Sequence, residues 1–201
     1  MSADRRPPIV IVLTGPSGVG KDALIDRLNE HNVGVVRPAT MTTRARRVGE
    51  VEGTHHYFVS REEFARQLAA GELLEHAEYD GNLYGVPRRS VREALETGQH
   101  VVIRVDVQGA ESLRGLLPSA LFLSLEPDHL DVLRQHLAQR GTETPEQIER
   151  RLATAREEIA RARLFCEQVR NIEGDLDATV AAVQALIDRE QARTDRAPVE
   201  V

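Results

Sequence analysis

The chain has 201 residues, of which 41% are hydrophobic and 29% charged, a composition that fits one globular α/β domain with insertions. Its net charge is −6 and its aromatic content only 3%, which argues against a nucleic-acid binder with a basic face and aromatic platforms for bases. No apolar run approaches the roughly 18 residues of a membrane span. The single cysteine, Cys166, cannot form an internal disulfide, and the apolar run at residues 9–13 is too short for a signal peptide, so we expect a cytoplasmic protein.

The first predicted elements alternate between apolar strands and helices. Residues 9–13 are wholly apolar and mostly β-branched, which is typical of a central parallel strand buried on both faces. A helix over residues 21–31 and a strand over residues 33–36 follow. Further strands are expected over 101–105 and 121–125, each followed by a helix, over 108–116 and 128–139. This alternation predicts a parallel sheet with helices on both faces.

Residues 37–86 break the alternation with a polar, glycine-containing stretch. Ser60 and Glu63 fit a capping box, so a helix is expected over residues 60–70, with short strands over 54–59 and 73–79. We interpret residues 37–86 as an inserted α+β subdomain. Residues 1–36 and 87–201 then form the core domain.

The last third of the chain is predicted to be mostly helical. Thr144 and Gln147 fit a second capping box with Pro145 at the first helical position, so a long helix is expected from residue 145 to about residue 163. An amphipathic helix is expected over about residues 175–191. Residues 192–201 are expected to form a disordered tail.

A glycine-rich segment joins the first predicted strand to the first predicted helix, and it matches the pattern GxxxxGK in the context that gives the pattern its meaning. Its residues are Gly15, Pro16, Ser17, Gly18, Val19, Gly20, Lys21 and Asp22. The glycines let backbone N–H groups turn inward around phosphate oxygens, and the helix N-terminus adds partial positive charge. The segment predicts an ATP-binding phosphate loop and a P-loop NTPase-type three-layer α/β fold.

Lys21 is the only lysine among the 26 basic residues of the chain. Arginine presents a planar fork and lysine a compact point charge, so the two are not interchangeable at a tight phosphate site. A lysine kept only in this loop indicates that the loop requires it. Lys21 is therefore predicted to reach the β- and γ-phosphates of ATP.

The last position of the phosphate loop departs from the usual pattern. A Ser or Thr, whose hydroxyl ligates Mg²⁺, normally stands where this chain has Asp22. A carboxylate is also a hard oxygen ligand for Mg²⁺. We expect Mg²⁺ to act with ATP, and the sequence leaves open whether Asp22 ligates the metal or only binds water around it.

Together with the phosphate loop, four further segments carry a resemblance to the guanylate kinase family over about residues 9–190. They are TMTTRARRVGE at residues 40–50 with HYFV at residues 56–59, LEHAEYDGNLYG at residues 74–85, DVQGA at residues 106–110, and RGTE at residues 140–143 with RRL at residues 150–152. The resemblance implies phosphoryl transfer from ATP to GMP or dGMP, with a helical lid at residues 140–157.

The resemblance also implies residue roles by matching position. Arg44 and Arg47 would bind the phosphate of the acceptor nucleotide, and Glu75 would accept hydrogen bonds from the guanine ring. Arg140 and Arg151 would be lid arginines that act with Lys21 and Arg44 on the transferred phosphoryl group. The acceptor site would also include Thr40, Glu50, His56, Tyr84, Val86 and Asp106, and Asn171 would lie beside the adenine of ATP.

Besides Asp22, three positions depart from the family pattern. His56 stands where the family has an acceptor-phosphate Tyr, Val86 where it has a Ser or Thr that contacts guanine, and His136 where it has a lid Arg. One alternative is therefore a specialised paralogue acting on another nucleoside monophosphate or on ribose 1,5-bisphosphate, whose kinases have a similar Gly-Lys-Asp loop. The other is a non-catalytic guanylate kinase-like binding module, although such modules usually lose the phosphate loop. The sequence leaves the oligomeric state open.

Overall fold

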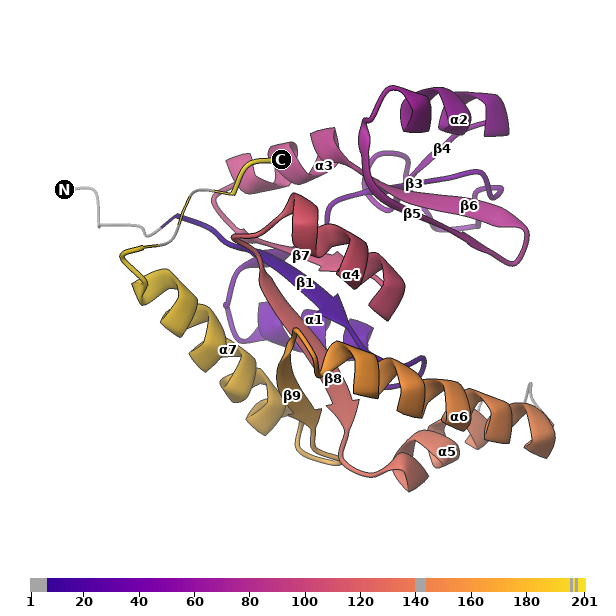
Figure 1. Ribbon diagram of the computed structural model, residues 1–201, viewed down its shortest axis with the longest axis vertical. Coiled ribbons are helices and arrows are strands. Elements are labelled where there is room, and N and C mark those ends of the chain that lie inside the picture. Colours follow the sequence, from indigo (N-terminus) through magenta and orange to yellow (C-terminus); the bar gives the residue numbers. More distant parts are fainter. Residues whose placement is uncertain (1–6, 140–143, 196, 198) are drawn as a thin grey trace.

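The computed structural model describes residues 7–139, 144–195, 197 and 199–201. Its core is a five-stranded sheet in the order β2-β7-β1-β8-β9 (Figure 1). Every strand pair in this sheet is parallel, as the sequence predicts. The strands are β1 (Val10–Thr14), β2 (Val35–Val36), β7 (His100–Arg104), β8 (Leu121–Pro127) and β9 (Glu167–Asn171).

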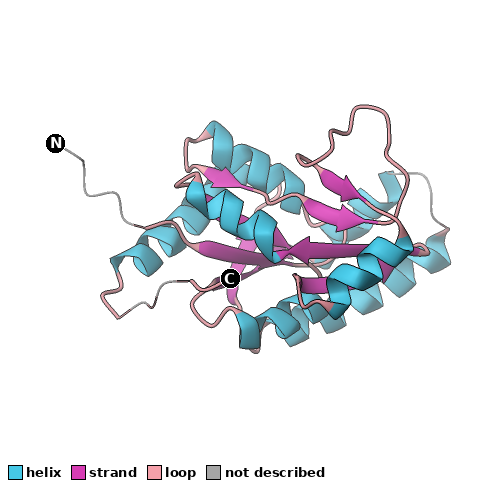
Figure 2. Ribbon diagram, turned by 90° about the horizontal axis from the view of Figure 1, so that it is seen from above, coloured by secondary structure: helices cyan, strands magenta, loops and turns pink. Residues whose placement is uncertain are grey.

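Helices cover both faces of the core sheet (Figure 2). Ile11 and Leu13 of β1 lie in one apolar cluster with residues of α1 (Lys21–Glu30) and α7 (Leu176–Ala192). Val10 and Val12 point to the other face and pack with α3 (Arg88–Glu96) and α4 (Val107–Leu116). Because successive side chains of a strand point to opposite faces, both faces of β1 are buried, which explains its uninterrupted apolar sequence.

A second sheet of four strands has the order β4-β3-β6-β5 and lies apart from the core sheet in Figure 1. Its elements are β3 (Thr40–Thr42), β4 (His56–Phe58), α2 (Arg61–Ala69), β5 (Leu73–Tyr79) and β6 (Asn82–Pro87). Phe64 of α2 is fully buried against Met41 and Leu73. Apart from Pro87 at the end of β6, all residues of these strands and of α2 fall in the range 37–86, which we interpret as an inserted subdomain.

Helices α5 (Leu130–Gln139) and α6 (Pro145–Ala162) pack on each other through Leu133, Leu137 and Leu152. In both ribbon views they extend on the same side of the core as the second sheet. The predicted lid range includes the start of α6. Residues 140–143, with Arg140, lie outside the described part of the chain.

The two predicted capping boxes have different outcomes. In α6 the box is complete, since the Thr144 side chain accepts from the Gln147 amide and the Gln147 side chain accepts from the Thr144 amide. In α2 the Ser60 hydroxyl accepts from the Glu63 amide, but the Glu63 carboxylate binds Gln67 and Arg66 instead of returning to Ser60. Only half of the box predicted at Ser60 is therefore formed.

Two further expectations need correction. Helix α3 and strands β3, β6 and β9 were not predicted as elements. The tail is not disordered where it is described at its end, because Val199 and Val201 pack against the apolar cluster of α3 and α4, and Arg92 Nε donates to the Val201 carbonyl over 2.7 Å. Among the described helices, none is both long and apolar enough to cross a membrane.

Candidate active site

The phosphate loop connects β1 to α1 at the carboxyl end of the core sheet. Gly15, Gly18 and Gly20 have φ values of 141°, 89° and 97°, which side chains with a Cβ rarely adopt. A Cβ atom at Gly15 would lie 2.3 Å from the Leu125 carbonyl oxygen, so the loop fits against β8 only with glycine there. The Asn171 side-chain amide donates to the Val19 carbonyl over 2.8 Å and holds the loop from β9.

Lys21 points back into the phosphate loop. Its ammonium donates to the carbonyl oxygens of Gly15 and Pro16, at 2.5 and 3.2 Å. Burial, with a smaller contribution from the charge of Arg104, lowers the pKa of Lys21 to about 8. The lysine is thus poorly solvated and lies where phosphate oxygens would replace the carbonyl contacts.

Asp22, in the first turn of α1, binds two arginines. Its Oδ1 accepts from Arg37 over 2.8 Å and its Oδ2 accepts from Arg104 over 3.1 Å. The described residues contain no group of three or more His, Cys, Asp or Glu that could hold a metal ion. Proteins usually bind Mg²⁺ through one or two carboxylates together with water and substrate phosphates, so this donor set fits a metal that ATP itself largely holds.

Five predicted acceptor residues form one group in the second sheet and the loop beside it, which we call the acceptor cluster. They are Thr40, Arg44, Glu50, His56 and Tyr84. Arg44 makes a two-pronged ion pair with Glu50, at 2.7 and 2.9 Å. Hydrogen bonds from Arg44, and then from the Arg47 amide, lower the pKa of Glu50 to about 2. Glu50 is therefore ionised at neutral pH and holds Arg44 in place.

His56 of β4 lies close to Glu50, with its Nε2 3.9 Å from Glu50 Oε1. Its Nδ1 is 2.7 Å from the Thr40 hydroxyl, and its ring lies 6.3 Å from that of Tyr84. Burial, and next the charge of Arg44, lowers the pKa of His56. The histidine is therefore neutral at pH 7. The Arg47 side chain is exposed, and the backbone of Arg47 binds Glu50: its amide donates to the carboxylate over 2.7 Å and its carbonyl oxygen accepts from the Glu50 amide over 3.2 Å.

Glu75 lies on β5 against the first turn of α4. A Cβ atom at Gly109 would lie 3.0 Å from Glu75 Oε1, so the glycine gives the carboxylate room beside the helix. Burial, followed by the charge of Asp106, raises the pKa of Glu75 to about 7. Val86 is opposite Glu75 on β6 and is buried. An acidic group and an apolar side chain thus stand side by side.

Asp106 caps α4 beside Glu75. Its Oδ1 accepts from the Gly109 amide over 2.8 Å, and its side chain is exposed. A Cβ atom at the same Gly109 would lie 3.0 Å from Glu75 Oε1. The charge of Asp106 acts on the pKa values of both Lys21 and Glu75, so this residue is within electrostatic range of both.

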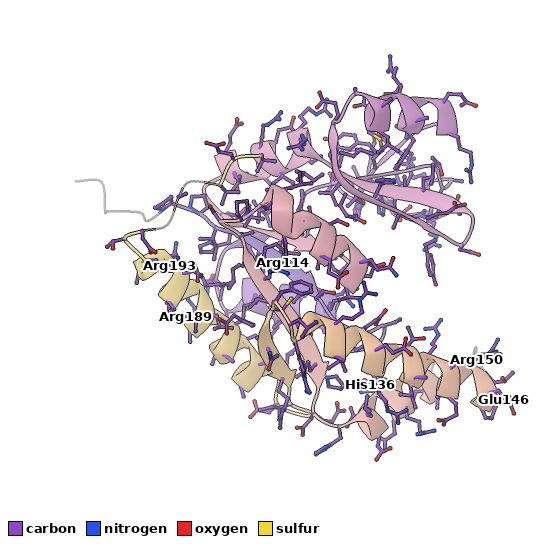
Figure 3. The ribbon with its side chains drawn as sticks, in the orientation of Figure 1. Arg114, His136, Glu146, Arg150, Arg189 and Arg193 are labelled. Atoms are coloured by element: carbon purple, nitrogen blue, oxygen red, sulfur yellow. The ribbon has the colours of Figure 1, made fainter. Side chains whose placement is uncertain are left out.

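The lid side of the site is partly described. Arg151 of α6 donates to the Ser17 hydroxyl of the phosphate loop over 3.4 Å. His136 of α5 has Nδ1 3.4 Å from the Gly18 carbonyl oxygen and Nε2 3.4 Å from Glu173. Figure 3 labels His136 on α5 and Arg150 far out along α6. The role of Arg140 stays a prediction.

Sequence reasoning missed Arg104 and Glu158. Burial raises the pKa of Glu158, on α6, while the charge of Lys21 opposes that shift. Arg104 could have been found, because it ends the otherwise apolar run VVIR and the carboxyl ends of parallel strands form the ligand-binding edge of such sheets.

A glycine loop around a buried lysine, facing arginines and carboxylates on a second sheet, defines a phosphate-loop nucleotide phosphotransferase. The guanylate kinase family model matches residues 6–190. The chain is 42% identical to guanylate kinase 2, chloroplastic/mitochondrial, of Oryza sativa subsp. japonica, over 96% of this chain and 68% of the relative. It is 45% identical to the guanylate kinase of Gloeobacter violaceus, over 90% and 87% of the two chains.

Among solved structures, the crystal structure of guanylate kinase from Anaplasma phagocytophilum is similar, with a TM-score of 0.69 and 30% identity. The similarity covers 95% of this chain and 90% of that one. The chain therefore belongs to the guanylate kinase family, and the predicted fold class and enzyme class are confirmed.

Proposed function

We propose that this protein transfers the γ-phosphoryl group of ATP to GMP or dGMP, giving ADP and GDP or dGDP. A phosphate oxygen of the acceptor attacks the γ-phosphorus, and the bond from that phosphorus to the β,γ-bridging oxygen breaks. ADP leaves with the electron pair. Such a step needs positioning and positive charge more than covalent help from the protein.

The observation that carries the proposal is that Asp106, which caps α4 beside Glu75, is close enough to both Lys21 and Glu75 for its charge to act on each of them. A site for a donor phosphate and a site for an acceptor base then share one space. Lys21 neutralises the donor phosphates, with Arg151 reaching the loop from α6. Backbone N–H groups of the loop from Gly15 to Asp22 would bind the phosphates of ATP. Asn171 would lie beside its adenine. Mg²⁺ bound to ATP would neutralise further phosphate charge.

On the acceptor side, the Arg44 guanidinium would bind the GMP phosphate with the Tyr84 hydroxyl and His56. Two parallel N–H donors match two phosphate oxygens, which makes arginine well suited to this contact. Arg47 would join them when the acceptor is bound, and the lid residue Arg140 would act with Arg151 on the transferred phosphoryl group. Glu50 acts by holding Arg44.

Glu75 would select the base. Its two carboxylate oxygens can accept from the N1 and N2 hydrogens of guanine, and adenine has no such pair of donors. The ionised form is required, and guanine donors would favour that form of a buried carboxylate. We place the reaction in the cytoplasm, supported by the buried free thiol of Cys166.

The presence of Val86 supports a second candidate for the acceptor substrate. A buried valine beside Glu75 offers the base no hydrogen bond, and a lost contact of this kind costs about 1–3 kcal/mol. The alternative acceptor is another nucleoside monophosphate or ribose 1,5-bisphosphate.

A coupled ADP-release assay with ATP, Mg²⁺ and a panel of acceptors tests the assignment. The panel contains GMP, dGMP, AMP, CMP, UMP and ribose 1,5-bisphosphate. We expect strong turnover of GMP and dGMP alone. Faster turnover of another acceptor would identify that compound as the substrate. ATP turnover that does not depend on any acceptor would contradict the proposed kinase activity.

A further inference from the structure

Arg104 ends β7 beside the phosphate loop. Its strand pairs with β1, and Arg104 is level with Leu13, two residues before Gly15. Val102 packs with Leu13 and with α1 in one apolar cluster. Because side chains two residues apart share a face of a strand, Arg104 points toward α1 as Val102 does. It meets the first turn of α1 at Asp22.

The Arg104 charge acts on both sides of the site. It lies close enough to Lys21 to help lower the pKa of that lysine, and it contributes in the same sense at His56. It also lines a cavity of about 380 Å³ together with Thr40, His56 and Val86. The guanidinium therefore lies between the phosphate loop and the acceptor cluster, where a transferred phosphoryl group has to pass.

Asp22 holds this arrangement. One carboxylate oxygen binds Arg104 and the other binds Arg37, and all three side chains are about half exposed. Without the carboxylate, two like charges would face each other and both long side chains would be free to leave the site. Both carboxylate oxygens of Asp22 are thus engaged by arginines, whose positive charges disfavour a divalent cation at the same carboxylate.

We propose that Arg104 is a further catalytic residue that contacts the transferred phosphoryl group, and that Asp22 is the positioning residue that holds Arg104 there instead of a direct Mg²⁺ ligand. The inference rests on the proposed ATP-dependent transfer. As the bond to the acceptor oxygen forms and the bond to ADP breaks, charge spreads over the three equatorial oxygens of the group. Arg104 supplies positive charge from the sheet, opposite the lid.

A double-mutant cycle tests the two roles together. Arg104→Gln should lower kcat about 100- to 1,000-fold, the range found when one preorganised charge-stabilising donor is lost, with the KM for GMP changed less than about 3-fold. Asp22→Asn should lower kcat about 3- to 10-fold through the displaced arginine. The double variant should be no slower than Arg104→Gln alone. If Asp22→Asn costs the same factor in both backgrounds and raises the Mg²⁺ concentration needed for half-maximal rate, the positioning role is wrong.

Binding without metal supplies a second readout. We would titrate wild type and each variant with ATP and with ADP in EDTA by calorimetry. Arg104→Gln and Asp22→Asn should each weaken ATP relative to ADP, and Arg104→Lys should restore part of the ATP preference. Equal weakening of both nucleotides would show that Arg104 does not contact the γ-phosphate. Because this measurement uses no acceptor, it tests the contact of Arg104 with ATP whether or not GMP is the substrate.

Arg37→Gln is the matched control. Arg37 and Arg104 have the same side-chain exposure, 46%, and share the partner Asp22. Arg37 follows β2, which pairs with β7 and not with β1, the strand that leads into the phosphate loop. We expect kcat within about 2-fold of wild type and an unchanged melting temperature. A loss equal to that of Arg104→Gln would mean that the ion pairs matter and the phosphoryl contact does not.

Discussion

The core sheet holds the phosphate loop through its backbone, whereas the second sheet and its loops hold the acceptor cluster through charged side chains. Gly15 fits against the Leu125 carbonyl, and Asn171 binds the Val19 carbonyl. Arg44, in contrast, is fixed by Glu50. A backbone cradle is rigid and has little tolerance for change. A side-chain cluster can be altered one charge at a time, so we expect substitutions there to have graded effects.

The largest expected effect is on the donor side. Lys21→Ala removes the only cation inside the phosphate loop, so turnover should fall about 10³-fold or more while the fold remains. Steady-state kinetics and circular dichroism check this. Lys21→Arg is the control for charge, and it should also be strongly impaired because the fork does not fit a site for a compact ammonium. A wild-type-like rate in Lys21→Ala would contradict the role of the loop.

On the acceptor side, Glu75→Gln should reduce kcat/KM for GMP about 10- to 100-fold and leave the KM for ATP unchanged, because one acceptor oxygen becomes a donor. If kcat/KM falls equally for every nucleoside monophosphate, Glu75 does not read the base.

The same residue gives a pH dependence. With a pKa of about 7, Glu75 loses its charge as the pH falls, so the KM for GMP should rise about tenfold from pH 8 to pH 6. Glu75→Gln shares every other titrating group, including the GMP phosphate, and should lack this component. An identical profile for both proteins would rule out titration of Glu75.

A smaller effect is expected from Glu50→Gln. The amide keeps the shape of Glu50 but not the charge that holds Arg44, so the KM for GMP should rise about 3- to 10-fold with the affinity for ATP unchanged. Glu63→Gln, on α2 and outside the acceptor cluster, serves as the control and should leave both constants unchanged. An equal effect on ATP would mean that the two sides of the site are not held independently.

The smallest effect is one of stability alone. Ser60→Ala removes the cap of α2, so the free energy of unfolding should drop by about 1 kcal/mol and the melting temperature by about 2–4 °C. Calorimetry measures this, and ATP affinity should not change. A loss of ATP affinity would show that the second sheet supports the phosphate loop.

The sequence predicted the core sheet better than it predicted the edge strands and the contacts between side chains. Strands β1, β7 and β8 were found because burial on both faces makes them continuous apolar runs. Strand β9 was missed because it lies at the sheet edge with only Val169 buried, and β3 is three residues long. The phosphate loop is one contiguous segment and was fully visible. The ion pairs of Asp22 with Arg37 and Arg104 join residues 15 and 82 positions apart, which no local pattern reveals.

The most direct test of the account is phosphorus NMR of the protein with ATP, Mg²⁺ and GMP. The account predicts that the γ-phosphorus signal of ATP falls until equilibrium is reached, while ADP and the new β-phosphorus of GDP form in equal amounts and the GMP signal falls by the same amount. Formation of ADP with inorganic phosphate in place of GDP, or no reaction with GMP, would contradict it.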